Sequence, residues 1–148
     1  MPYIPNIIIQ DTIHKKKLLS KKKCTLWLSH LVKTKTTLTI RIVDEAESQS
    51  LNNQYRKINK PTNILSFLIN DEPLVGDLIL CHSVIKKEAF VQKKRICDHY
   101  AHLIIHGYLH LLGFNHNKDD DALLMENKEI AVLKKLGIKN PYMSNIIK

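Results

Sequence analysis

The sequence has few of the residues that cross-link small secreted proteins or bind structural zinc through thiolates. Its three cysteines, Cys24, Cys81 and Cys97, are widely spaced, and no pair forms a C-x-x-C motif. An odd number of cysteines without that spacing predicts neither a disulfide framework nor a cysteine zinc site. We therefore interpret the cysteines as buried free thiols.

The sequence also lacks a long apolar run. No stretch approaches the roughly 18 to 20 apolar residues that a membrane span needs, and the beginning, MPYIPNIIIQD, lacks the basic-then-apolar build of a secretory signal. Internal repeats and Gly/Ser-rich linkers are absent as well. Because 148 residues suffice to bury one hydrophobic core, we expect residues 1–148 to form a single cytoplasmic domain with no membrane partner.

Arginine is scarce although positive charge is abundant. The formal net charge is +9, yet only Arg41, Arg56 and Arg95 are arginines among 23 basic residues. A basic surface of this size favours a polyanionic partner, and nucleic acid is preferred over a membrane because no basic amphipathic helix with aromatic anchors is evident. A lysine-rich composition also arises from compositional bias in a chain rich in Ile and Asn, so charge alone leaves the partner open.

The hydrophobic pattern predicts the element order βαβαββααα. Short β-branched or apolar runs indicate strands, and apolar residues at helical spacing indicate helices. We expect strands at residues 3–10, 36–43, 62–69 and 75–81, and helices at residues 18–34, 44–57, 83–92, 95–112 and 119–136. This order predicts an α+β fold, close to α/β, in which helices cover a small mixed sheet.

The segment HGYLHLLGFNH contains three histidines at the spacing H-x3-H-x5-H. Residues four apart lie on one face of a helix about 6 Å apart, so His106 and His110 are placed to bind one metal ion. Gly113 ends the helix and lets His116 fold back as a third ligand. Three neutral imidazoles leave one position of a tetrahedral zinc open, as in catalytic zinc sites. The spacing therefore predicts one zinc per chain at the end of a helix.

The same histidine spacing occurs in the zinc-peptidase motif H-E-x-x-H-x-x-G-x-x-H. Gly107 stands where those peptidases carry the glutamate that acts as general base, so a peptidase would need a base from elsewhere. Two histidines on an apolar helix face are often packed core residues, but a third one after the helix-ending glycine favours a metal site. His99 and His102 extend the stripe upstream, where packing or support of the ligands is expected.

The motif HGYLHLLGFNH, with YRKINKPTNILSF and LVGDLILC upstream, resembles the YbeY family of bacterial single-strand-specific endoribonucleases, or rRNA maturation factors. The resemblance is strongest over residues 36–142. It implies that His106, His110 and His116 bind one zinc and that Arg56 is an important active-site residue. It also implies single-stranded rRNA and the ribosome or its small subunit as partners, 16S rRNA 3′ end maturation and ribosome quality control as roles, and no small-molecule cofactor.

Two positions depart from the pattern of that family. Asn115 stands where the family usually has aspartate, and Leu68 stands where proline commonly follows LSF. The asparagine carbonyl can still accept a hydrogen bond, but it adds no negative charge around the metal.

Arg56 is the candidate phosphate clamp, because a guanidinium binds two phosphate oxygens at fixed geometry in a chain that otherwise uses lysine. Ser66 could add a hydrogen bond, although a structural role fits it equally. Zinc could activate a water molecule or act as a Lewis acid on a phosphate oxygen. The functional hypothesis is a zinc-dependent endoribonuclease; the alternatives are a zinc peptidase or other hydrolase, and a non-catalytic ribosome-assembly factor with a structural zinc.

Overall fold

The structure is a computed structural model that describes residues 3–14, 18–115 and 118–142. Its elements follow the predicted order of strands and helices. They are β1 (Asn6–Asp11), α1 (Lys21–Leu28), β2 (Thr36–Val43), α2 (Glu45–Arg56), β3 (Ile64–Asn70), β4 (Leu74–Cys81), α3 (His82–Val91), α4 (Ile96–Leu111) and α5 (Asp119–Lys135).

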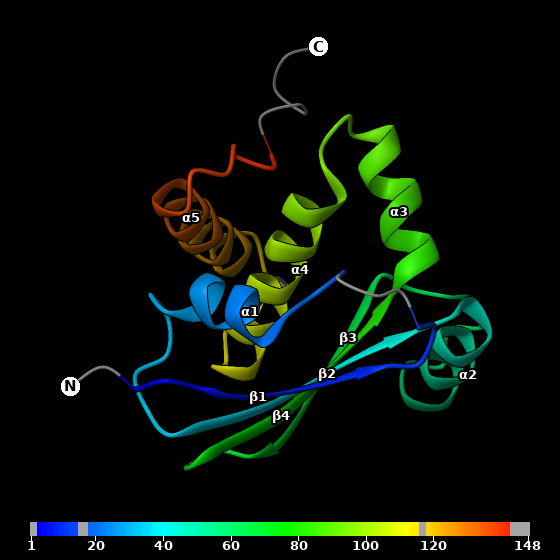
Figure 1. The fold of residues 1–148 in the computed structure, drawn as a ribbon, viewed down its shortest axis with the longest axis horizontal. Coiled ribbons are helices and arrows are strands. Elements are labelled where there is room, and N and C mark those ends of the chain that lie inside the picture. Colours follow the sequence, from blue (N-terminus) through cyan, green and yellow to red (C-terminus); the bar gives the residue numbers. More distant parts are fainter. Residues whose placement is uncertain (1–2, 15–17, 116–117, 143–148) are drawn as a thin grey trace.

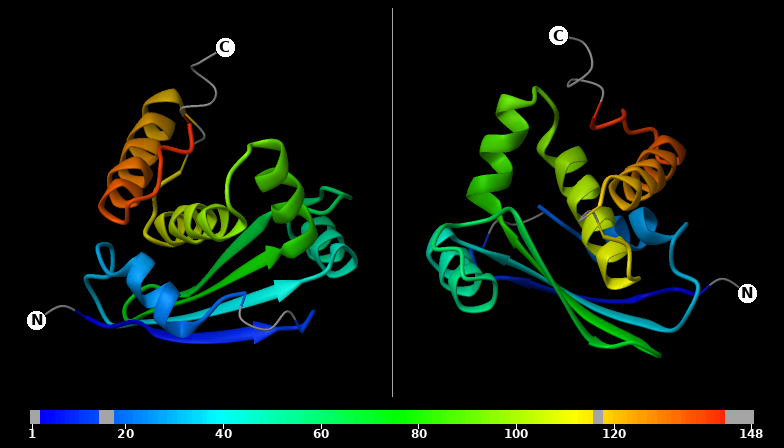
Figure 2. Two further views of the ribbon diagram at one scale, coloured as in Figure 1. Left: turned by 45° about the horizontal axis from the view of Figure 1, so that its top comes forward. Right: turned by 180° about the vertical axis from the view of Figure 1, so that it is seen from behind.

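The strands form one mixed sheet in the order β1-β2-β4-β3. β1 and β4 are both parallel to β2, whereas β3 runs antiparallel to β4. Helices α1, α3, α4 and α5 lie on one side of this sheet (Figures 1 and 2). The prediction of a single α+β domain with helices over a small mixed sheet is therefore confirmed.

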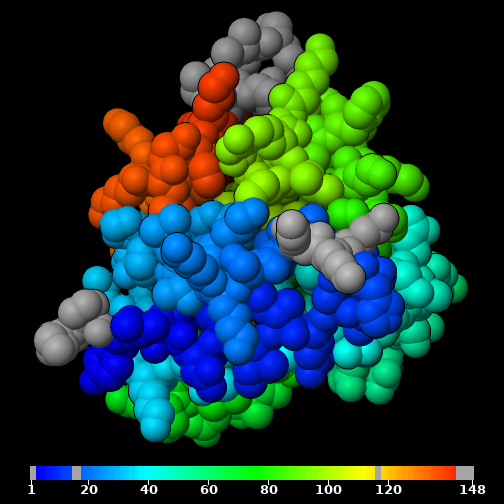
Figure 3. Space-filling model, in the orientation of Figure 1, coloured from blue at the N-terminus to red at the C-terminus, as the bar shows by residue number. Residues whose placement is uncertain are grey.

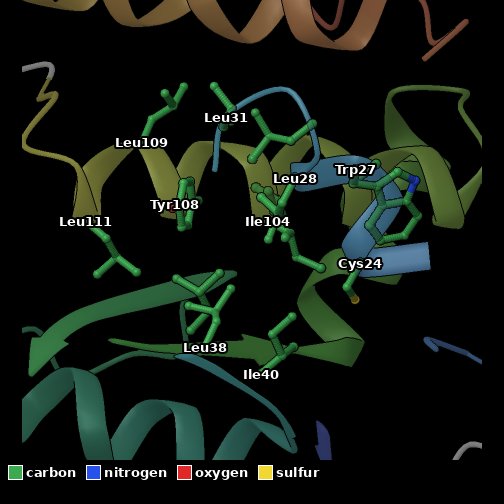
Figure 4. Packing of buried hydrophobic residues seen from close by; sticks show 14 of the residues in the cluster. Cys24, Trp27, Leu28, Leu31, Leu38, Ile40, Ile104, Tyr108, Leu109 and Leu111 are labelled. Atoms are coloured by element: carbon green, nitrogen blue, oxygen red, sulfur yellow. The ribbon is translucent and has the colours of Figure 1, made fainter. Parts of the chain in front are cut away.

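The hydrophobic core lies between the sheet and α4. Residues alternate along β2, so that Leu38 and Ile40 are fully buried while Thr39 between them is less so. Figure 4 shows Leu28 of α1 and Ile104 of α4 above these two side chains, and all four belong to one buried cluster. Helix α4 contacts α1, α3, α5, β3 and β4. It is therefore the central helix, and its packing fixes the positions from which its histidines project.

The first helix is shorter than predicted. The expectation of a helix over 18–34 was wrong, because the hydroxyl of Ser20 accepts a hydrogen bond from the Lys23 amide and begins α1 there. At the other end, the Ser29 hydroxyl donates to a backbone carbonyl within the last turn. Leu31 is buried although it lies beyond the end of the helix. Its helical spacing from the preceding apolar residues therefore reflects contact with the core and not a continuing helix.

The expectation of buried free thiols is confirmed for Cys24 and Cys81, whereas Cys97 is a free thiol that is only partly buried. None of the three forms a disulfide. Burial raises the pKa of the Cys24 thiol to about 12, which keeps it protonated and unreactive. Among the described residues, no helix has the length and apolar character needed to cross a membrane.

Candidate metal centre

Two histidines of α4 face one another at its carboxyl-terminal end. The Nε2 atoms of His106 and His110 lie 3.1 Å apart, and the two rings are tilted by 79°. Zinc binds imidazole nitrogens at about 2.0 to 2.1 Å, which places two tetrahedral ligands about 3.3 to 3.4 Å apart. The pair is therefore spaced to hold one metal ion or, when no metal is bound, to share a proton.

Glu129 of α5 orients the first of these rings. Its carboxylate accepts a hydrogen bond from Nδ1 of His106. A proton on Nδ1 leaves the lone pair of the ring on Nε2, the atom that faces His110. A carboxylate behind a metal-binding histidine is a common arrangement that fixes the tautomer and raises the basicity of the ligand.

Glu129 is an ionised carboxylate with no exposed surface. Burial alone would raise its pKa, but hydrogen bonds from His102, His106 and Tyr142 outweigh burial and hold the pKa at about 2. Within the described part of the chain its ion pairs are with histidines only, not with a lysine or an arginine. A cation on His106 and His110 would compensate this buried negative charge, so the donor set fits a divalent metal.

His102 and Tyr142 surround the same carboxylate. Nε2 of His102 lies 3.5 Å from Glu129 Oε1 and 3.4 Å from the Tyr142 hydroxyl. Burial lowers the pKa of His102, whereas burial and then Glu129 raise the pKa of Tyr142. The phenol therefore stays protonated and donates to Glu129, and His102 lies beside the same carboxylate.

A second ligand set is possible at the same place. His102, His106 and Glu129 each offer one atom, and these atoms lie within 4.8 Å of one another. That set requires Glu129 to exchange its hydrogen bonds from His106 and Tyr142 for a metal bond. We favour the His106 and His110 pair, because Glu129 is fully buried and already engaged.

Glu129 and Tyr142 were not predicted from the sequence. The signal for Glu129 was its position, since it shares one face of α5 with Met125, Val132 and Leu133, all of which are buried. A charged residue within an apolar stripe needs a polar partner in the core. Tyr142 carries no comparable signal, because it follows the last helix in an irregular segment.

The predicted third ligand, His116, lies outside the described residues. The turn that leads to it is described: Gly113 has a φ of 102°, and the amide of Phe114 donates to the Leu109 carbonyl at 3.0 Å. This left-handed residue ends α4, as expected from a glycine. Asn115 follows in an exposed position.

Arg56 lies next to the same end of α4 through Ser66. It is the last residue of α2, is exposed, and donates from Nη2 to the Ser66 carbonyl of β3 at 3.3 Å. Its guanidinium also lies 5.7 Å from the centre of the Phe67 ring. The Ser66 hydroxyl faces α4, 3.1 Å from where a Cβ on Gly107 would be. Ser66 thus connects Arg56 with the helical turn that carries His106.

Gly107 is packed against the sheet rather than turned toward the histidines. A Cβ at this position would lie 2.7 Å from Ile64 Cδ1 and 2.8 Å from Leu78 Cδ2. A glutamate at residue 107 would therefore enter the contact between α4 and the sheet. Both atoms are the ends of apolar side chains that a larger residue would have to displace, so packing adds a steric cost to the missing carboxylate.

Comparisons with known proteins give a consistent family. The family model described as "Endoribonuclease YbeY" matches residues 8–137. A curated relative of the same description from Alteromonas mediterranea is 48% identical over 132 residues, which cover 83% of this chain and 84% of that protein. Another from Colwellia psychrerythraea is 47% identical over 139 residues, covering 86% and 90%.

One solved structure resembles the fold. The solution structure of TM1509 from Thermotoga maritima aligns with a TM-score of 0.58 and covers 88% of this chain and 91% of that chain. The sequence identity is 23%, so this likeness concerns the fold alone.

Proposed function

The chain belongs to the endoribonuclease YbeY family, and we propose on this basis that it is a zinc-dependent hydrolase that cleaves single-stranded RNA. Its proposed place is rRNA processing, with 16S rRNA 3′ end maturation and ribosome quality control on the ribosome or its small subunit, in the cytoplasm. The net charge of +9 supports a polyanionic substrate. In this proposal residues 1–148 act as one catalytic domain.

The observation that carries the proposal is the pairing of His106 with His110 in front of the buried Glu129. We propose that these two histidines and His116 hold the ion, and that the ion is zinc, because imidazole nitrogens suit zinc better than magnesium or calcium. When bound, zinc supplies Lewis acidity that can activate water or stabilise charge on a phosphate.

The residues of the chain have separate roles in this proposal. Arg56 binds the scissile phosphate, where cleavage increases negative charge on the oxygens, and its guanidinium stays protonated throughout. The Ser66 carbonyl accepts a hydrogen bond from Nη2 of Arg56 and so holds the side chain next to β3. Glu129 keeps the proton of His106 on Nδ1, so that the ring orientation does not change with the substrate.

The peptidase alternative is disfavoured because residue 107 lacks the carboxylate and a larger side chain there would have to displace Ile64 and Leu78. An assembly factor with a structural zinc differs in having a fourth protein ligand. Incubating the purified zinc form with end-labelled single-stranded RNA, DNA of the same sequence and a peptide separates the three functions. We expect RNA alone to be cleaved, with activity lost on chelation and restored by zinc. Intact RNA with zinc bound would favour the assembly factor, and peptide cleavage would favour the peptidase.

A further inference from the structure

A cavity of about 870 Å³ lies beside the amino-terminal end of α4, away from His110. We call it the α4 cavity. Its walls are residues 92–95, Asp98, His102, Leu133 and residues 137–141. The loop between α3 and α4 and the segment after α5 flank the first turn of α4 at the top of the view (Figures 1 and 3).

The rim of the α4 cavity is positively charged. Lys93, Lys94, Arg95 and Lys139 line it, and Asp98 is the one carboxylate among the described lining residues. That carboxylate is paired with Arg95 at 3.2 Å, so the three lysines remain as the cations of the rim. No side chain among the described residues caps the amino end of α4, whose positive dipole end adds to this charge.

Lys94 is partly buried in this wall. Burial lowers its pKa, and the carboxylates of Glu88 and Asp98 oppose this. A half-buried ammonium loses part of its hydration, and an anion bound in the cavity would offset this loss for the charged form of Lys94. The loop between α3 and α4 has a fixed conformation, because the amides of Lys93 and Lys94 donate hydrogen bonds to carbonyls in the last turns of α3.

The floor of the cavity is apolar. Leu133, Ile138 and Pro141 form the floor. A positive rim beside an apolar surface suits the phosphates and bases of single-stranded nucleic acid.

The α4 cavity adjoins the metal centre through one shared side chain. His102 lines the cavity, and its Nε2 lies 3.5 Å from the carboxylate that orients His106. Its Nδ1 is buried without a hydrogen-bond partner among the described residues. His102 and His110 are eight residues apart on α4, about 12 Å along the helix axis, a distance that a strand of several nucleotides can span.

We propose that the α4 cavity binds a nucleotide of the single-stranded RNA substrate beyond the one at the scissile bond, with its phosphate at the lysine rim and its base on the apolar floor. The inference rests on the proposed function, because it takes the same RNA as ligand. It adds a second point of attachment that favours strands long enough to reach both sites.

The test is the double variant Lys93→Glu/Lys139→Glu, which reverses two exposed rim charges outside the metal centre. The matched control is Lys33→Glu/Lys35→Glu, an equal charge change at exposed positions before β2 that do not line the cavity. Fluorescence anisotropy at fixed salt measures the affinity for a long single-stranded RNA, a dinucleotide and adenosine monophosphate. Crosslinking with 4-thiouridine RNA identifies the residues in contact.

The double variant Lys93→Glu/Lys139→Glu, here called the rim variant, should bind the long RNA at least about tenfold more weakly than the control variant, because two phosphate-binding cations are lost. It should bind the dinucleotide as the parent does, and crosslinks should map to residues 92–95 or 137–141. Equal affinities of the two variants for long RNA, while the parent binds and cleaves it, would overturn this inference and leave the proposed function standing. Adenosine monophosphate binding that is lost in the rim variant, with RNA affinity unchanged, would overturn RNA as the ligand. A parent protein that neither binds nor cleaves RNA would overturn the proposed function itself.

Discussion

Nε2 of His106 lies 3.1 Å from Nε2 of His110, while the other nitrogen of His106 is held by a carboxylate from a different helix. The pair arises from local sequence, since one helical turn separates the two residues. Its orientation arises from the packing of α5 on α4, which brings Glu129 behind the rings. The candidate metal centre is thus an assembly of two helices, and changes on α5 should alter it.

Glu129→Gln should weaken zinc binding without removing it. Glutamine has the size of glutamate but lacks the charge that fixes the His106 tautomer, and loss of such a partner typically lowers metal affinity by about 10- to 100-fold. Competition with a chromophoric chelator measures this change. Glu72→Gln, at an exposed position, serves as control and should bind zinc as the parent does. An unchanged zinc affinity in Glu129→Gln would show that the Glu129 carboxylate does not support metal binding.

Arg56→Ala should reduce single-turnover RNA cleavage by about a hundred- to a thousandfold, roughly 3 to 4 kcal/mol in the transition state, as for other preorganised charge-stabilising donors. Zinc content and folding should be unchanged, because an exposed arginine contributes little stability. Arg56→Lys should recover RNA binding at low salt but only a minor part of the rate. Lys60→Ala, on the exposed loop that follows, is the control. Cleavage by Arg56→Ala at the parent rate would show that another group stabilises the charge on the scissile phosphate.

Gly107→Ala should lower the free energy of unfolding by about 1 to 3 kcal/mol, because the added methyl overpacks the contact of α4 with Ile64 and Leu78. Gly107→Glu should lose more stability and gain no peptidase activity. Urea unfolding and a peptide assay measure both outcomes. Asn127→Ala, at an exposed position of α5, should be neutral or slightly stabilising. A stable Gly107→Glu protein that cleaves peptides would restore the peptidase hypothesis.

Glu88 should contribute stability that depends on pH. It accepts hydrogen bonds from His99 at 2.8 Å and from Asn63 at 3.2 and 3.3 Å. Burial raises the pKa of Glu88, but these hydrogen bonds outweigh it and the pKa is lowered from 4.5. A depressed carboxyl pKa stabilises the fold above the unfolded pKa, and this contribution is lost as the pH falls through the folded pKa.

Glu88→Gln should therefore cost about 1 kcal/mol near neutral pH, as for a hydrogen bond to a charged group that is partly solvated. The difference from the parent should shrink as the pH falls below 4.5. Urea unfolding of both proteins across this range measures it. A difference that stays constant with pH would show that the charge of Glu88 is not what stabilises the α3–α4 contact.

Local patterns predicted the fold order and part of the site. Helical spacing placed His106 with His110, glycine ended α4 at Gly113, and Arg56 lies at the end of α2 where the sequence put it. These features depend on residues a few positions apart. Glu129 reaches His106 across 23 positions, and such a contact depends on how two helices pack, which periodicity does not specify.

The errors have the same physical origin. The apolar residues around α1 suggested a longer helix, because residues that touch the core from a turn look like a helical stripe in sequence. Leu18 and Leu19 pack against the core from the segment before Ser20, the residue that caps the helix. The α4 cavity could not be predicted from the sequence either, because its lysines come from two segments that are far apart along the chain and meet only in the fold.

Zinc content of His110→Ala and His102→Ala, measured side by side by elemental analysis, tests the metal centre most directly. The parent should carry one zinc per chain, as three histidines in this arrangement predict. His110→Ala should lose most of its zinc and remain folded, whereas His102→Ala should keep its zinc, because His102 supports Glu129 rather than the ion. His30→Ala, an exposed histidine, is the control. Normal zinc in His110→Ala together with loss in His102→Ala would contradict the His106 and His110 pair and place the ion between His102, His106 and Glu129.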